Sequence, residues 1–271
     1  MQVKQRRLGL IAGCGDFPLL FAEAAKAQGV SLVCVAIKDE ASAKLTNAVE
    51  TIHWVTFGEV KKVIDIFKHE GITRAVMLGG ITKTRFFKDR PAVDAGGNAV
   101  LRLAKDKKDL TLFKAAALYL RLHGITLVSA LICLNDLLAR KGTITQREPT
   151  ARERGDITFG YRIAKRVAGL DIGQTVAVKD KVILAVEAIE GTDSAIRRAG
   201  TLGNGGIVIV KTARPGQDMR FDIPVIGART ITVLKEAGVS CLALEKNKTL
   251  IAGRAEVARL ADEADIAVVV V

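Results

Sequence analysis

The chain has 271 residues, which suffices for one large domain or two modest ones. Hydrophobic residues make up 49% and aromatic residues 4%, which favours an aliphatic core of Val, Ile and Leu strands covered by helices. Lys plus Arg is 41 against 29 Asp plus Glu, a formal charge of +12. This charge suits nucleic acid, an anionic membrane surface, a small phosphorylated molecule or simply a basic surface of the kind thermophiles carry. Nucleic acid is disfavoured, because no binding signature is present and the few aromatics do not interleave with the cations.

The first half alternates apolar strands with helical patterns. Glycine turns follow two of the strands. The expected strands are residues 8–12, 30–37, 74–78 and 125–129, and the expected helices are residues 18–28, 59–69 and 109–122. Continuous apolar strands separated by helices indicate a parallel sheet covered on both faces. We therefore expect an α/β protein with a Rossmann-like N-terminal domain over residues 1–140.

The composition changes near residues 140–155, and the polar, turn-rich stretch at residues 140–149 marks the expected domain boundary. Residues 141–271 are expected to form a mixed α/β C-terminal domain that carries the catalytic groups. Its pattern predicts a hairpin (175–178 and 182–188), a helix opened by residues 190–193, strands at 206–210 and 221–226, a helix at 228–237, a second hairpin (239–244 and 249–251), a helix at 256–264 and a strand at 266–271.

Gly13 and Gly15 follow the first strand and precede a helix, where backbone amides can approach a phosphate. The spacing is not GxGxxG, because Pro18 stands where the third glycine would be, and no Walker lysine follows. Gly79 and Gly80 follow a second strand, so both turns are expected at one rim of the sheet, with Lys83 available to neutralise phosphate. The alternatives are an ordinary strand–turn–helix corner and a solvated basic loop.

Four acidic residues are candidates for metal or catalytic chemistry, namely Glu187, Glu190, Asp193 and Asp222. Asp222 lies among apolar neighbours in an expected strand, and a carboxylate there is costly unless it is paired or binds a metal. Oxygen ligands suit Mg²⁺ or Mn²⁺. The alternatives are a helix N-cap for Asp193 and a salt bridge for Asp222. The four cysteines show no CxxC spacing and are interpreted as buried thiols of a reducing compartment.

Four segments together carry a resemblance to a known family. They are residues 8–15 with Pro18, 170–174 (LDIGQ), 184–193 (LAVEAIEGTD) with Arg197 and Arg198, and 222–227 (DIPVIG). With this order and spacing, which agree over essentially the whole chain, the sequence resembles the peripheral-membrane UDP-2,3-diacylglucosamine pyrophosphatase family, of the LpxI type.

The resemblance implies a two-domain hydrolase with a substrate cleft between the domains. It implies that water attacks the α-phosphorus of UDP-2,3-diacylglucosamine, with Mg²⁺ as cofactor, and that UMP and 2,3-diacylglucosamine 1-phosphate (lipid X) are released for lipid A biosynthesis. It implies catalytic roles for Asp222, Asp193 and Thr192, and metal ligation by Asp222 and Glu190. It also implies substrate binding by Gly191 and Gln174, beside the glycine turns and Lys83.

The resemblance further implies a cytoplasmic protein peripherally attached to the inner membrane, and it favours a homodimer. The adjacent phenylalanines among the cations of residues 83–90 fit a lipid surface or a capped core. No run of 18 apolar residues is present, so no membrane span is expected. Two rival functions stay open: a nucleotide-dependent oxidoreductase, with Asp39 and Glu40 near the ribose-binding position, and a basic regulatory module without enzymatic activity.

Overall fold

The structure is a computed structural model that describes residues 7–80, 92–106, 109–221 and 223–271. The chain divides into two compact units. The first is Met1–Asn135 with Asp218–Asp222, and the second is Asp136–Gln217 with Ile223–Val271. Each unit is described by itself, and the substrate cleft expected between two domains stays a prediction.

The first unit is built on a parallel five-stranded sheet in the order β3-β2-β1-β4-β5. The strands are β1 Arg7–Ala12, β2 Ser31–Ile37, β3 Thr51–Val55, β4 Arg74–Leu78 and β5 Thr126–Leu127. The helices are α1 Phe17–Ala27, α2 Leu45–Ala48, α3 Val60–His69, α5 Ala95–Leu103, α6 Asp109–Leu122 and α7 Leu131–Leu134, followed by the 3₁₀ turn η1 Asn135–Leu137, which straddles the division. Strand order reverses between β1 and β4, and in open parallel sheets ligands bind beside such a reversal.

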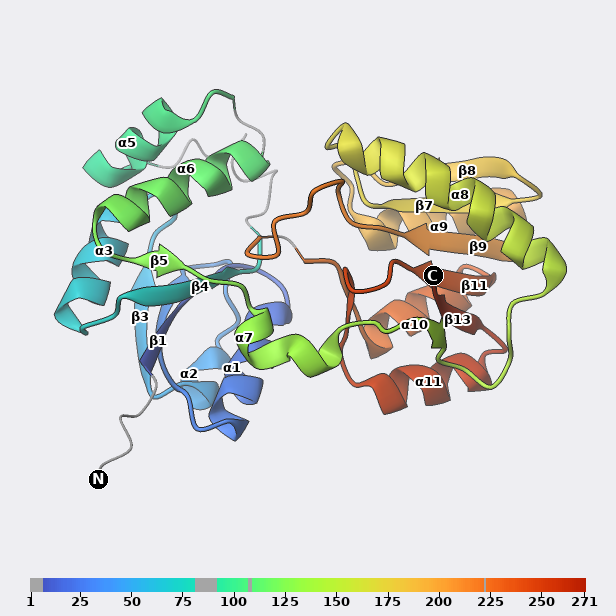
Figure 1. Ribbon diagram of the computed structural model, residues 1–271, viewed down its shortest axis with the longest axis horizontal. Coiled ribbons are helices and arrows are strands. Elements are labelled where there is room, and N and C mark those ends of the chain that lie inside the picture. The colour runs from blue at the N-terminus through green and yellow to red at the C-terminus, as the bar shows by residue number, and fades with distance from the viewer. Residues whose placement is uncertain (1–6, 81–91, 107–108, 222) are drawn as a thin grey trace. The chain divides into compact units, whose positions relative to one another are not determined.

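Helices cover both faces of this sheet (Figure 1). Ile11, Val33 and Val35 pack against Phe67 of α3 and Leu120 of α6 in one buried cluster. On the opposite face α1 buries its apolar side chains, which are Pro18, Phe21, Ala22 and Ala25. The expectation of a parallel sheet between two helical layers is confirmed.

The second unit is built on a six-stranded mixed sheet in the order β6-β13-β11-β9-β7-β8. Its strands are β6 Gly142–Thr143, β7 Thr175–Lys179, β8 Val182–Val186, β9 Ile207–Lys211, β11 Val239–Leu244 and β13 Ala267–Val270. Strands β9, β11 and β13 are parallel, whereas β6, β7 and β8 run antiparallel to their neighbours. The helices are α8 Ala151–Gly169, α9 Thr192–Gly203, α10 Ala228–Glu236 and α11 Arg254–Glu263, and a separate pair of short strands is β10 Val225–Ile226 and β12 Leu250–Ile251.

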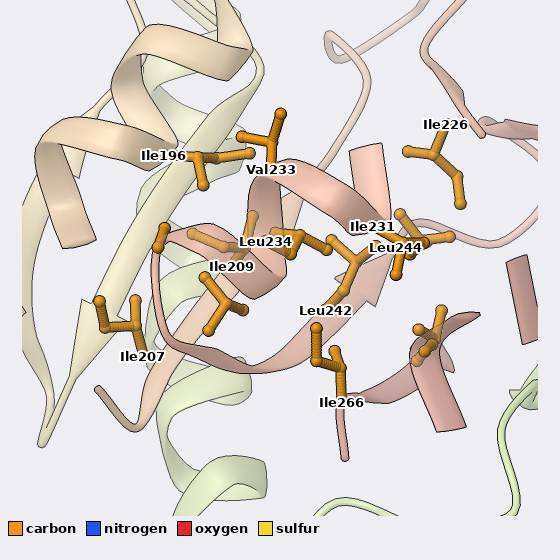
Figure 2. Close-up of a cluster of buried hydrophobic side chains, with 14 of the residues drawn as sticks. Ile196, Ile207, Ile209, Ile226, Ile231, Val233, Leu234, Leu242, Leu244 and Ile266 are labelled. Atoms are coloured by element: carbon orange, nitrogen blue, oxygen red, sulfur yellow. The ribbon is translucent and has the colours of Figure 1, made fainter. Parts of the chain in front are cut away.

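Alternate residues of each central strand face different helices. Val208 and Val210 of β9 pack towards α8, whereas Ile207 and Ile209 pack towards α9, α10 and α11. Figure 2 shows this second cluster, in which Leu234 of α10 lies among the isoleucines and leucines of β9 and β11. The expected first hairpin is β7–β8, and the mixed α/β expectation for this unit is confirmed.

Three sequence-based expectations in this unit are wrong or incomplete. No helix was expected between the boundary and the first hairpin, but α8 begins at Ala151 behind a Thr150–Glu153 capping box. The second hairpin does not exist: β12 pairs in parallel with β10, and β11 lies between β9 and β13. Among the described residues of the expected strand at 221–226, only Val225–Ile226 is a strand, because Pro224 has no N–H for a ladder.

Candidate functional site

The two glycine turns of the first unit lie at the carboxyl ends of β1 and β4 and bond to each other. The Gly13 amide donates to the Leu78 carbonyl at 2.8 Å, and the Cys14 amide donates to the Gly80 carbonyl at 2.8 Å. A Cβ on Gly13 or on Gly79 would lie less than 3.0 Å from backbone atoms of the other turn. Close approach of two backbones therefore explains these two glycines, and the amides of Gly13 and Cys14 are occupied.

Gly15 differs from its neighbours, because it has φ +89° and no atom lies within 4 Å of where its Cβ would be. It leads into α1, whose N-cap Asp16 is exposed and makes no side-chain capping bond. The helix dipole favours an anion here, but the Asp16 carboxylate opposes one. The substrate-binding roles of Gly13, Gly15, Gly79 and Gly80 stay predictions.

In the second unit, polar groups from four elements meet at one edge of the sheet. Lys211 ends β9 and Thr175 begins the antiparallel β7, and the two residues pair in the ladder. Glu187 follows β8 directly, and Thr192 begins α9. Alternating strand directions thus bring residues from distant parts of the chain to the same edge.

The Thr192 hydroxyl connects the two charges of this edge. It donates to Glu187 Oε1 at 2.7 Å and accepts from Lys211 Nζ at 3.0 Å. Lys211 Nζ also donates to Thr175 Oγ1 at 3.3 Å, and the Gln174 amide donates to Glu187 Oε2 at 3.2 Å. We call Thr175, Glu187, Thr192 and Lys211 the edge cluster.

Glu187 is ionised although most of its surface is buried. Burial by itself raises the pKa of the Glu187 carboxyl, but the Lys211 charge and the hydrogen bonds from Thr192, Thr175 and the Gln174 amide lower that pKa below its ordinary value. The edge cluster is therefore a fixed arrangement of one anion, one cation and two hydroxyls that is largely shielded from water.

The segment before β7 packs closely against the backbone of Glu187. A Cβ on Gly173 would lie less than 3.0 Å from the Glu187 carbonyl oxygen, so only glycine is accommodated there. Asp171, with φ +60°, accepts from Arg214 Nε at 2.6 Å, and the Thr212 amide donates to the Gln174 carbonyl at 2.9 Å. Gln174, expected to bind substrate, thus uses its main chain to hold Glu187 and the end of β9.

A second ion pair fixes the chain that leaves β9. Lys165 Nζ lies 2.9 Å from Glu245 Oε1 and donates to the Ala213 carbonyl at 2.7 Å, and Glu245 Oε2 accepts from the Ala213 amide at 2.7 Å. This clamp holds the chain directly after β9.

Glu190 and Asp193 flank the start of α9 and already have cationic partners. Glu190 accepts from Arg198 Nη2 at 2.6 Å and from the Ala188 amide at 3.1 Å, and Asp193 lies 3.1 Å from Arg229. Asp193 is not the N-cap; Gly191 holds that position with φ 83°, and no side chain caps the helix. The alternative reading of Asp193 as an N-cap is wrong.

The described residues do not by themselves assemble a metal site. Within the ranges that the structure describes, no three His, Cys, Asp or Glu side chains gather to hold an ion. Both carboxylate oxygens of Glu190 accept hydrogen bonds. Asp222, the other expected metal ligand and expected catalytic aspartate, lies outside the described residues, as does Lys83.

Sequence reasoning singled out Glu187 and Thr192 but missed Lys211. The sequence does carry a signal for Lys211. This lysine ends the apolar run Ile207–Val210, which is expected to be a strand buried on both faces of a sheet. Arg214, Lys165 and Glu245 were also missed, because only the fold brings them to this edge.

Comparison with known proteins gives two family matches that together span most of the chain. The model of the LpxI N-terminal domain matches residues 7–137, and that of the LpxI C-terminal domain matches residues 140–269. A protein of Caulobacter vibrioides named UDP-2,3-diacylglucosamine pyrophosphatase LpxI is 28% identical over 270 residues, 95% of each chain.

Solved structures give much weaker matches. The ADP-bound biotin carboxylase domain of a thermophilic 2-oxoglutarate carboxylase has TM-score 0.28 and 12% identity, over 63% of this chain and 34% of that one. The biotin carboxylase subunit of pyruvate carboxylase has TM-score 0.29 and 12% identity, over 68% and 38%. The chain thus spans just over a third of the length of those structures.

Proposed function

We propose that this chain, which belongs to the LpxI family, hydrolyses the diphosphate bond of UDP-2,3-diacylglucosamine. Water attacks the α-phosphorus, and the products are UMP and 2,3-diacylglucosamine 1-phosphate. The protein is thus a hydrolase of lipid A biosynthesis. Support comes from the matches to both domain models and from the name of the Caulobacter relative.

The structural observation that carries the proposal is the start of α9. Gly191 opens this helix without a side-chain cap, so its first-turn amides and the helix dipole favour an anion. The Asp193 carboxylate in the first turn opposes an anion, but it is paired with Arg229. The buried Lys211 cation lies beside it through Thr192. An uncapped helix start next to a desolvated cation suits a phosphate group, and the phosphoryl transition state needs the same stabilisation.

The proposed residue roles follow from this placement. Thr192 contacts the reacting group from the start of α9, and the Gly191 turn binds the diphosphate. Gln174 supports the site through its backbone. Asp222 is the essential carboxylate, and Asp193 and Glu190 stand near the reacting phosphate. Gly13, Gly15, Gly79, Gly80 and Lys83 contribute substrate contacts from the first unit.

We propose Mg²⁺ as the cofactor, with Mn²⁺ as a substitute. Mg²⁺ is commonly held by one or two carboxylates together with substrate phosphates, so a site with few protein donors suits it when the diphosphate is bound. Asp222 is the residue expected to hold it. When bound, the ion offsets phosphate charge.

We propose that the chain works at the cytoplasmic surface of the inner membrane. The exposed side chains of α5, α6 and the residues after α5 support this, because they include the leucines Leu101, Leu103, Leu118 and Leu122 and the cations Arg102, Lys105, Lys114 and Arg121. Leucines that enter the lipid and cations that meet anionic head groups are the two components of interfacial binding. Among the described residues, no helix is both long and apolar enough to cross a bilayer. A homodimer is also proposed.

Turnover of purified protein tests the proposal. The chain is incubated with UDP-2,3-diacylglucosamine, and UMP and the sugar phosphate are identified by mass spectrometry. Release of both products, at equal rates, is expected. A folded protein that releases neither with Mg²⁺ or Mn²⁺ present contradicts the proposal, and tight binding of NAD by that protein would favour the oxidoreductase instead.

A further inference from the structure

Lys211 is a buried cation that has no direct carboxylate partner among the described residues. Its exposed fraction is 8%, and among the ion pairs of the described residues no carboxylate lies within 4.0 Å of Nζ. Lys211 Nζ donates instead to the hydroxyls of Thr175 and Thr192. A lysine is almost never buried unless it is paired. The compensating charge is Glu187, which Lys211 reaches through Thr192.

The hydrogen bonds of Thr192 have only one consistent direction. A hydroxyl has one proton and two lone pairs. Ionised Glu187 has no proton to give, so the Thr192 proton must point at Glu187 Oε1. Lys211 has only protons to give, so it occupies one lone pair of Thr192 Oγ1. One lone pair is left on a half-buried hydroxyl at the start of α9.

We infer that Lys211 and Glu187 are positioning residues that hold Thr192 Oγ1 as a hydrogen-bond acceptor for the attacking water. The inference rests on the proposed hydrolysis and adds to it. Thr192 accepts a hydrogen bond from the water and takes no proton from it. A water held in this way keeps its oxygen lone pair free to face the phosphorus, next to the α9 amides.

Protonation of Glu187 reverses the chain of hydrogen bonds. A neutral Glu187 can donate to Thr192, and the threonine proton then turns outward as a donor. The groups facing Glu187 are Lys211 from β9, Thr192 from α9, Thr175 from β7 and the Gln174 amide. Only Lys211 among them carries charge. A variant without the Lys211 charge still buries Glu187, and burial disfavours the ionised carboxylate, so the pKa of Glu187 must rise.

The test compares Lys211→Met with Lys179→Met. Lys179 ends the same strand, β7, that Thr175 begins, and it donates to the Gly203 carbonyl at 2.6 Å, so it controls for the loss of a lysine from this sheet. We expect the acid limb of the kcat/KM profile to move to higher pH by at least about one unit in Lys211→Met, roughly a tenfold loss on that limb. The limb stays in place in Lys179→Met. KM changes less than kcat.

Two further variants keep the test decisive if Lys211→Met unfolds. Glu187→Gln removes the titrating group, so the acid limb of this variant's pH profile no longer reports Glu187. Its kcat is expected to fall by roughly tenfold or more. Thr192→Ser keeps the hydroxyl and retains most activity, whereas Thr192→Val loses it. A Glu187→Gln variant with normal kcat and an unchanged limb overturns the inference.

A readout without substrate separates this inference from the proposed function. Carbon-13 NMR of labelled glutamate carboxyls, assigned by the Glu187→Gln spectrum, follows the titration of Glu187 in the full chain. The midpoint is expected to rise in Lys211→Met and to stay in Lys179→Met, whether or not the chain hydrolyses the sugar nucleotide. An unchanged midpoint in Lys211→Met overturns the inference, while absence of turnover with a raised midpoint overturns only the proposed function.

Discussion

At the scale of single residues, each buried charge of the second unit is held by several partners. Glu153, which is 7% exposed, binds Arg147 through both oxygens at 3.0 and 3.1 Å and accepts from the Thr150 amide at 2.7 Å. Burial raises the pKa of Glu153, but the hydrogen bonds from Arg147, Ser240 and Thr150 outweigh it and lower the pKa to about 2. Such groups link folding to pH.

Acid should therefore destabilise the protein through Glu153. Because its pKa is lower in the folded chain than the ordinary 4.5, its contribution is present above pH 4.5 and disappears as the pH falls towards 2. The shift corresponds to at most about 3 kcal/mol. Between pH 7 and pH 3, the free energy of unfolding measured with urea should fall less in Glu153→Gln than in the unmodified chain.

The exposed Glu256, which pairs with Arg259 at 2.7 Å, is the matched control. Glu256→Gln should change unfolding at both pH values by less than about 1 kcal/mol, because exposed ion pairs contribute little. An identical pH response in the Glu153→Gln variant and the unmodified chain would refute the assignment.

Residue types and positions predicted part of the site. Glu187 was one of four acidic candidates, and Thr192 was implied by the family resemblance. Lys211 was not singled out, because a single sequence cannot show that β7 runs antiparallel to β9 and brings Thr175 beside it. Gly13 and Gly79 were expected to make room for a phosphate, whereas the structure shows each making room for the other turn.

At the scale of elements, α8 shows how a helix packs closely through a glycine. A Cβ on Gly160 would lie 2.7 Å from Val178 Cγ2 and 2.9 Å from Val210 Cγ2, both in the sheet below. Gly155, one and a half turns earlier, has only Lys181 Cε at 3.7 Å. The two glycines share a helix and differ in what they face.

Alanine should therefore have opposite effects at these two positions. Gly160→Ala forces the helix from the sheet and should lower the free energy of unfolding by about 1–3 kcal/mol. Gly155→Ala should raise it by about 0.5–1 kcal/mol, because alanine is the better helix former. Thermal and urea unfolding measure both, and a Gly160→Ala variant as stable as Gly155→Ala would show that α8 does not pack as described.

The errors of the fold prediction also belong to elements. Strands β11 and β12 are close in sequence and were paired as a hairpin, but β11 is central, with β9 and β13 as its parallel neighbours. Sequence proximity favours hairpins, and parallel pairs are formed by strands far apart in the chain. The long helix α8 was missed because its polar face and its early glycine resemble a linker.

The exposed face of α5 and α6 should bind anionic lipid. Leu118 and Leu122 are 48% and 70% exposed, and the double change Leu118→Ser with Leu122→Ser should reduce co-sedimentation with phosphatidylglycerol-containing vesicles by about tenfold. The control is Leu202→Ser on α9, where the leucine is 62% exposed. Equal vesicle binding by the unmodified chain, the double variant and Leu202→Ser would contradict the lipid assignment. If the double variant instead changes its oligomeric state, the partner of these leucines is a second copy of the chain.

At the scale of the whole molecule, each unit has its own sheet and its own helices, and the two family models meet near residue 140, close to where the units divide. Composition predicted their aliphatic cores, and the +12 charge predicted an anionic partner without specifying it. The residues expected to complete the chemistry, Asp222 and Lys83, lie outside the described ranges, so their roles are the ones that experiment must supply.

Removal of divalent metal should stop turnover. Excess EDTA is expected to abolish release of UMP, and Mg²⁺ or Mn²⁺ should restore it, because the proposed diphosphate carries charge that few protein donors offset. Full activity in EDTA after dialysis would contradict the cofactor assignment while leaving the reaction itself in place.

The most direct measurement is hydrolysis in water enriched in oxygen-18. Water that attacks the α-phosphorus leaves its oxygen on UMP, so mass spectrometry should find one labelled oxygen in UMP and none in 2,3-diacylglucosamine 1-phosphate. Label in the sugar phosphate would place the attack on the other phosphorus, and intact UDP-2,3-diacylglucosamine after incubation with folded, metal-supplied protein would contradict the proposed reaction altogether.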